Sequence, residues 1–337
     1  MVVTCKPPVA VIEKSHLAST GKRQRALLYA CLTAILWGTA YVAAKYALRA
    51  LGPFTAATGR FVLGAGLLWP LLALPATRRP GDSPGQVTRR IDRRDRFLVV
   101  AIGLFQVTFY FALQYVGMRY TTAANTALIV NTRPVFVALL SAVWLHEGLG
   151  RRKLAGILMA FLGVVILTLG QGGTAFGFSA GRALGDLLIL LNAVSGAIAI
   201  ILLKRMLGHY TPLLTAAYTT TAGALGLSVL AIIEMARGTA AVAWPGGSLS
   251  SWLAVIFMAV FNTVIPYLLW YSALSELSTT ETTVFLYITP LVSVLLSAVL
   301  LDEPLGIGLL IGGALILAGA YRTVSTGQAK PANLGQL

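Results

Sequence analysis

The stretch RPVFVALLSAVWLHE at residues 133–147 recurs as TPLVSVLLSAVLLDE at residues 289–303. The two segments lie 156 residues apart and are identical at eight of fifteen positions, among them Pro134 with Pro290 and Glu147 with Glu303. The same shift aligns further aromatic and glycine positions without a gap: Phe105 with Phe261, Tyr115 with Tyr271, Gly150 with Gly306, Gly156 with Gly312 and Gly163 with Gly319. The chain is therefore built from two related halves.

Each half contains five apolar runs. A composition of 57% hydrophobic and 11% charged residues favours lipid over water as the solvent. A bilayer core about 30 Å thick needs roughly 20 residues of helix. Suitable runs occupy residues 26–44, 54–74, 97–118, 123–145, 154–170, 187–203, 213–233, 252–275, 282–301 and 305–321. We therefore expect an all-α integral membrane protein with ten transmembrane helices. Because five is odd, the second half must be inverted relative to the first, as in many alternating-access carriers.

The net charge of +15 comes from short basic clusters between the apolar runs. Five Lys and Arg residues precede residue 26, and seven arginines occur from Arg78 to Arg96. Basic residues prefer cytosolic loops, so this distribution predicts a multi-pass protein of the plasma or inner membrane with both termini in the cytosol. The charge is thus a topology signal, and we expect no nucleic-acid partner.

The repeat and the tails divide the chain into five parts. Residues 1–25 are predicted to be a disordered cytosolic tail, 26–170 the first five-helix repeat, and 171–184 a linker. Residues 185–323 are predicted to be the second repeat, and 324–337 a second disordered tail.

The sequence lacks the constellations that an enzyme or a metal site would need. Its two cysteines and three histidines are scattered, and no phosphate-binding GxxxxGK[ST] motif occurs. We therefore expect no catalytic residues, no cofactor and no metal. A secondary transporter is the leading interpretation; a membrane enzyme and a receptor or channel are the alternatives from other classes.

Several segments resemble one known family. They are WGTAYVAAKYAL at 37–48, GRF at 59–61, GDLLILLNAVSGAIAIILLKR at 185–205, and the P-x9-[WL]-x-x-E pattern that ends the fourth and ninth runs. Together they resemble the EamA family of the drug/metabolite transporter superfamily. The resemblance implies a ten-helix bundle whose central site is lined mainly by helices 1, 3, 4, 6, 8 and 9. It also implies transport, usually export, of amino acids or related metabolites. The chain departs from the family at Arg133, where the residue before the proline is usually uncharged.

Arg133 is predicted to lie about halfway along its helix. A charge at the bilayer centre costs about 2.5–3.5 kcal/mol on insertion scales, so it should face a cavity or a partner. One hypothesis is that Arg133 binds a carboxylate or another anionic group of the substrate. The alternative is a structural ion pair, or hydrogen bonds to backbone groups that Pro134 leaves free. Asn125, eight residues earlier and about 80° around the helix, would share its face.

Gln106, Tyr110 and Gln114 are spaced four apart on the third run, as on one stripe of a helix. The 156-residue shift places a second set on the eighth run: Asn262, Pro266 and Trp270. The two sets are predicted to line the substrate pathway, with packing between helices as the alternative. Trp37 and Tyr41 on the first run would add aromatic walls, unless they are packing or interface anchors.

The remaining candidates have structural or mechanical roles. Pro134, Pro266 and Pro290 are candidate hinge or gating positions. Glu281 is a candidate for proton coupling, with an ordinary helix-start acid as the alternative. Four further charged residues are interpreted as structural. Glu147 and Glu303 have a gating role as the alternative, and snorkelling or ion pairing would explain Lys45 and Arg60.

The central positive charge bears on the substrate. A carrier of lipophilic cations needs a carboxylate inside the membrane, and the first run has none. The predicted partners are therefore the lipid bilayer and a small zwitterionic or anionic metabolite such as an amino acid, with drugs and sugars or nucleosides as alternatives. The small-residue stripes Gly156-x-x-x-Ala160 and Gly308-x-x-x-Gly312 allow close packing within a monomer or in a homodimer.

Overall fold

The fold was analysed in a computed structural model of the chain, which describes residues 9–73, 91–121, 126, 129–169, 180–237, 249–301 and 307–325. These residues form helices joined by turns, with no strand among them. Six helical segments in this part of the chain are long and apolar enough to cross a membrane: Gly21–Ala44, Arg96–Gly117, Ala183–Leu207, Pro212–Ala236, Leu249–Glu276 and Thr279–Leu296. The protein is therefore an all-helical, multi-pass membrane protein.

The first half contains α1 (Val9–Ala47), α2 (Pro53–Leu71), α3 (Arg96–Gly103), the π-helix η2 (Leu104–Thr108), α4 (Phe109–Gly117), α6 (Arg133–Trp144) and α7 (Arg151–Leu169). The second half contains α8 (Ala180–Leu207), α9 (Pro212–Ala236), α10 (Leu249–Ala259), the π-helix η3 (Val260–Val264), α11 (Ile265–Glu276), α12 (Thr279–Thr283), the 3₁₀-helix η4 (Val284–Tyr287), α13 (Ile288–Leu301) and α14 (Ile307–Ser325). Each of the ten expected apolar runs overlaps one of these helical segments.

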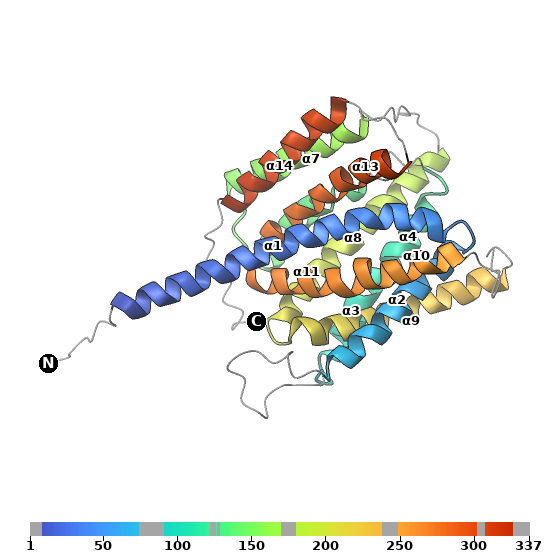
Figure 1. The fold of residues 1–337 in the computed structure, drawn as a ribbon, viewed down its shortest axis with the longest axis horizontal. Coiled ribbons are helices and arrows are strands. Elements are labelled where there is room, and N and C mark those ends of the chain that lie inside the picture. Colours follow the sequence, from blue (N-terminus) through green and yellow to red (C-terminus); the bar gives the residue numbers. More distant parts are fainter. Residues whose placement is uncertain are drawn as a thin grey trace.

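Helix α1 begins at Val9, inside the segment expected to be a disordered tail, and its first turns extend away from the bundle (Figure 1). Residues 9–20 contain no proline or glycine. Once a helix is nucleated, each added residue costs little, so the long membrane helix can continue into this polar segment. Residues 1–8 and 326–337 of the predicted tails, and 171–179 of the predicted linker, lie outside the described residues.

The sequence repeat reappears in the helix boundaries. The π-helices η2 and η3 occupy residues 104–108 and 260–264, which are separated by the same 156 residues. Helices α7 and α14 keep this spacing at both ends, 151–169 against 307–325. A π turn inserts one extra residue into a helix and frequently marks a functional site. Its presence at the same place in both halves therefore directs attention to the third and eighth predicted spans.

The two halves also exchange equivalent contacts. Helix α1 packs against α11 and α13 of the second half, and α8 packs against α4 and α6 of the first half. Helices α7 and α14 lie side by side at one edge of the bundle (Figure 1). Close approach there depends on glycine, because a Cβ atom on Gly163 would lie 2.6 Å from the Gly312 carbonyl oxygen. Gly156 of the predicted stripe also faces α14, because a Cβ atom there would lie 2.8 Å from the Gly319 carbonyl oxygen, so the stripe of α7 is used for packing within the chain.

Candidate functional site

Arg133 is the first residue of α6, after a turn at Asn131 and Thr132, and so does not lie within a continuous helix as the sequence suggested. The corresponding segment of the second half is also interrupted, since η4 precedes α13. Pro134 lies in the first turn of α6, where its missing N–H removes no helical hydrogen bond. The backbone groups that Pro134 was expected to free are therefore not the partners of Arg133.

The guanidinium of Arg133 is held by a tyrosine and lacks a counter-charge. Its Nη2 donates a hydrogen bond to the Tyr110 hydroxyl, and its Cζ lies 4.5 Å from the centre of the Tyr110 ring. Its Nε is buried against Gly196 of α8 and has no hydrogen-bond partner. Within the described part of the chain, no carboxylate forms an ion pair with Arg133. The structure thus contains a cation between helices whose charge is not neutralised by these residues.

Asn192 of α8 also contacts Tyr110, and the sequence analysis had not singled it out. Its Nδ2 donates to the Tyr110 backbone carbonyl at 2.5 Å, while its own Oδ1 is buried without a partner. On the preceding turn of the third span, Ser195 donates to the Phe105 carbonyl at 2.7 Å. The signal in the sequence was an amide in the middle of an apolar run, since amides in membranes seek partners.

Asn262, also in the second half, makes a similar contact with α1. Its Nδ2 donates to the Leu36 carbonyl and to Thr39 Oγ1 of α1, and its Oδ1 is likewise buried without a partner. The Asn262 carbonyl, in the π turn η3, accepts from Trp37 Nε1 at 3.2 Å. A carbonyl in each π turn therefore accepts a hydrogen bond from a side chain of the other half: Phe105 in η2 from Ser195, and Asn262 in η3 from Trp37.

Arg60 of α2 is an internal clamp. Its side chain donates from Nε to Thr263 Oγ1 at 2.8 Å and from Nη2 to the Asn262 carbonyl at 2.6 Å. The residue is only 9% exposed, and its Cζ lies 4.9 Å from the Phe61 ring centre. Snorkelling and ion pairing, the two explanations expected from the sequence, do not describe this contact. Arg60 instead fixes α2 to the π turn of the opposite half.

An aromatic cluster joins these polar contacts. Trp37 lies 5.2 Å from Trp270 and 6.2 Å from Tyr267, measured between ring centres. Phe61 continues the cluster from Tyr267 to Phe111 at 6.2 and 5.3 Å, and Phe111 lies 5.2 Å from the Tyr110 ring. The structure thus brings together the predicted Trp37, Trp270 and Tyr110. Phe61, Phe111 and Tyr267 had been missed, because aromatic residues in apolar runs give no separate signal.

The other predicted residues fall in several places. Gln106 Oε1 accepts from the Tyr271 hydroxyl at 3.0 Å, whereas Tyr110 faces Arg133; the π turn between them alters the simple stripe that spacing by four implied. Gln114 is half-buried on α4. The Pro266 carbonyl, next to η3, accepts from Thr33 at 3.4 Å, and Pro290 lies in the first turn of α13. Asn125 and Glu303 lie outside the described residues, as do the side chains of Tyr41 and Lys45.

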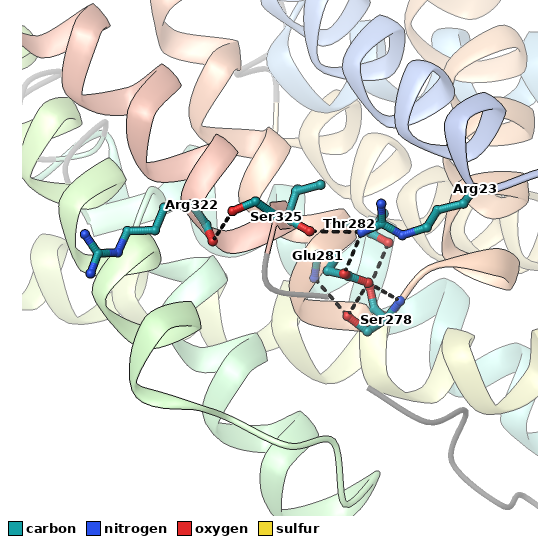
Figure 2. Close-up of polar contacts among 7 residues, drawn as sticks. Arg23, Ser278, Glu281, Thr282, Arg322 and Ser325 are labelled. Atoms are coloured by element: carbon teal, nitrogen blue, oxygen red, sulfur yellow. Dashed lines mark hydrogen bonds and ion pairs between the residues drawn. The ribbon is translucent and has the colours of Figure 1, made fainter. Parts of the chain in front are cut away.

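A second polar cluster lies at one end of the bundle, which we call the Arg23 end (Figure 2). It comprises Arg23 of α1, Glu281 of α12, the N-cap residue Ser278 that precedes α12, and the last turn of α14. Arg23 Nη2 donates to Glu281 Oε1 at 3.1 Å and to the Val324 carbonyl at 2.9 Å. Glu281 is also the N3 residue of a capping box whose N-cap is Ser278. This is the contact expected of an ordinary acid at a helix start.

Glu147 reaches the same short helix from the other half. Its carboxylate accepts from the backbone N–H of Thr279 at 2.8 Å, from the Thr279 hydroxyl at 2.7 Å and from the backbone N–H of Thr280 at 3.4 Å. A carboxylate is favoured at a helix N-terminus, where N–H groups lack intrahelical partners. Glu147 and Arg23, both from the first half, thus hold α12 of the second half.

The comparisons with known proteins agree with this architecture. The sequence model of the EamA-like transporter family matches residues 24–169 and 183–325. An uncharacterized transporter of Archaeoglobus fulgidus is 29% identical over 293 residues, covering 87% of this chain and 96% of the relative. A probable terminal-alkyne amino-acid exporter of Streptantibioticus cattleyicolor is 26% identical over 301 residues, covering 88% and 93%. One crystal structure has the same fold, with a TM-score of 0.69, 23% identity, and coverage of 89% of this chain and 96% of that one.

Proposed function

This chain belongs to the EamA-like transporter family, and we propose that it exports amino acids or related small zwitterionic or anionic metabolites by alternating access. In this proposal ten transmembrane helices form two inverted halves in the plasma or inner membrane. The ten expected runs all overlap helices, and equivalent contacts are exchanged between the halves. Both termini are proposed to face the cytosol because most Lys and Arg residues fall on that side.

The proposed substrate class rests mainly on Arg133 at the start of α6, whose guanidinium has no carboxylate partner among the described residues. In transporters, interrupted helices place the positive ends of their dipoles toward anionic substrate groups. Here the helix start and the guanidinium coincide, and the described residues provide no carboxylate for it. A substrate carboxylate would supply the missing charge. A relative of this chain is named as an amino-acid exporter, which supports the same substrate class.

The proposed role of the Arg23 end is that of a closed gate. Alternating access requires contacts between the halves to form at one end and to break at the other. Glu147 with Thr279, and Arg23 with Glu281, are both contacts between halves, and both lie at the end proposed to face the cytosol. The conformation described is therefore proposed to be closed to the cytosol.

Counterflow into proteoliposomes tests the proposal. We expect exchange of radiolabelled amino acids and no exchange of quaternary ammonium compounds. Arg133→Gln should abolish exchange, whereas Arg133→Lys should retain part of it because the charge remains but the planar guanidinium is lost. Insertion and folding are checked by gel filtration and thermal unfolding. Unchanged exchange in a folded Arg133→Gln protein, or exchange of quaternary ammonium compounds alone, would overturn the proposal.

A further inference from the structure

Two asparagines inside the bundle share an unusual condition. Asn192 and Asn262 are both fully buried, each donates its Nδ2 to a backbone carbonyl of a neighbouring helix, and each leaves Oδ1 without a partner. Buried polar atoms in folded proteins are nearly always paired, so an unpaired acceptor calls for an explanation such as a ligand. Both residues belong to the second half, Asn192 on α8 and Asn262 in η3, and they differ in what surrounds them.

Asn192 shares its partner residue with Arg133. The amide of Asn192 holds the Tyr110 backbone carbonyl, and the guanidinium of Arg133 holds the Tyr110 hydroxyl. The Nε of Arg133 also lies against Gly196, which is four residues, or one helical turn, beyond Asn192 on α8. Asn192, with its unpaired acceptor, and Gly196, against which the Arg133 side chain lies, are therefore about 6 Å apart along the axis of α8.

We propose that Asn192 determines specificity by accepting a hydrogen bond from the ammonium group of a substrate whose carboxylate binds Arg133. This inference rests on the proposed function and narrows its substrate class to α-amino acids. An ammonium group provides three donors and no acceptor, so it complements the carbonyl oxygen of an amide. The ammonium and carboxylate of an α-amino acid are separated by two bonds, a spacing that fits two protein groups one helical turn apart.

The matched asparagine is the negative control. Asn262 is equally buried and also has a free Oδ1, but the cation nearest to it is Arg60, whose Nε and Nη2 already donate to Thr263 and to the Asn262 carbonyl. Asn262 contacts neither Tyr110 nor Arg133 through any hydrogen bond in the described part of the chain. Its amide is thus assigned to packing of α1 against η3.

The test compares leucine with 4-methylpentanoate, the same molecule without its amino group, in proteoliposomes containing the full chain. The wild-type protein should exchange leucine roughly 10- to 100-fold more efficiently, because the carboxylate alone leaves Oδ1 unpaired. Asn192→Leu should remove this preference mainly by slowing leucine exchange. Asn192→Ser, whose hydroxyl still donates to a carbonyl, is the second variant if Asn192→Leu fails to fold. It should also reduce the preference for leucine. Asn262→Leu should lower both rates and keep their ratio.

The outcomes separate the two proposals. If Asn192→Leu lowers both rates equally, Asn192 only supports the helix packing and this inference fails while the proposed function stands. A wild-type protein without preference between the two compounds also overturns the inference alone. If the wild-type protein exchanges neither these compounds nor other amino acids, the proposed function itself fails.

Discussion

The carboxylate of Glu147, which follows α6, accepts hydrogen bonds from the backbone N–H and the hydroxyl of Thr279, the first residue of α12. A side chain of one half thus caps a helix of the other half, 132 residues later in the chain. Glu147 is the last residue of the repeated segment 133–147, so this contact gives the glutamate of that segment a structural role. In the first copy Glu147 thus contacts the opposite half, whereas its counterpart Glu303 lies outside the described residues.

Replacing Glu147 by Ala should loosen α12. Loss of a capping side chain costs about 0.5–2 kcal/mol, and here it also removes a contact between the halves. Hydrogen exchange of the Thr279 and Thr280 amides should become faster by roughly tenfold. Glu276→Ala, a change of an exposed glutamate at the end of α11, should leave these amides unaffected. Equal protection in both variants would remove Glu147 from the proposed gate.

The ion pair between Arg23 and Glu281 should contribute little to stability by itself. Arg23 is 40% exposed, and exposed pairs are worth about 0.2–1 kcal/mol. A double-mutant cycle with Arg23→Gln and Glu281→Gln should therefore give a coupling energy in this range, measured by thermal unfolding. Gln at position 281 can keep the capping box, so the cycle isolates the charge. The coupling should shrink in high salt; a coupling that is large and independent of salt would contradict this account.

Arg60→Met should destabilise the protein by about 3 kcal/mol, because it leaves buried acceptors of η3 without a charged donor. Arg60→Lys should recover only part of this loss, since an ammonium lacks the fork that reaches Thr263 Oγ1 and the Asn262 carbonyl together. Thermal unfolding in detergent provides the measurement. If Arg60→Met were as stable as the wild type, Arg60 would have no clamping role.

Two glycines make a matched pair for packing. Gly163→Ala should destabilise the protein by about 1–3 kcal/mol, because the added Cβ would lie 2.6 Å from the Gly312 carbonyl oxygen on α14. Gly66→Ala on α2 meets no atom within 4 Å and should stabilise its helix by about 0.5–1 kcal/mol. The two variants should therefore shift the unfolding temperature in opposite directions. A stabilising Gly163→Ala change would show that α7 and α14 pack less tightly than described.

The sequence alone identified the membrane environment, the helical class, the repeat and the resemblance to the EamA family, which is confirmed by the family match. These properties depend on composition and on periodic patterns, which can be recognised without knowing the contacts between distant residues. It also selected Arg133, because a charge within an apolar run is costly wherever the helices pack. Helical spacing and the repeat shift placed Tyr110 and Trp270 among the candidates, and its aromatic side chain on the first run placed Trp37 there.

Only the tertiary structure decided how these residues are used. The break before Arg133 and the π turns at 104–108 and 260–264 change the angular relation between residues, so spacing by four no longer predicts a shared face. The partners of Arg60 lie about 200 residues away in the chain, and so do those of Asn262. A single sequence gives no local signal for such pairings, because they arise when the two halves pack together and each buried polar group must find a partner.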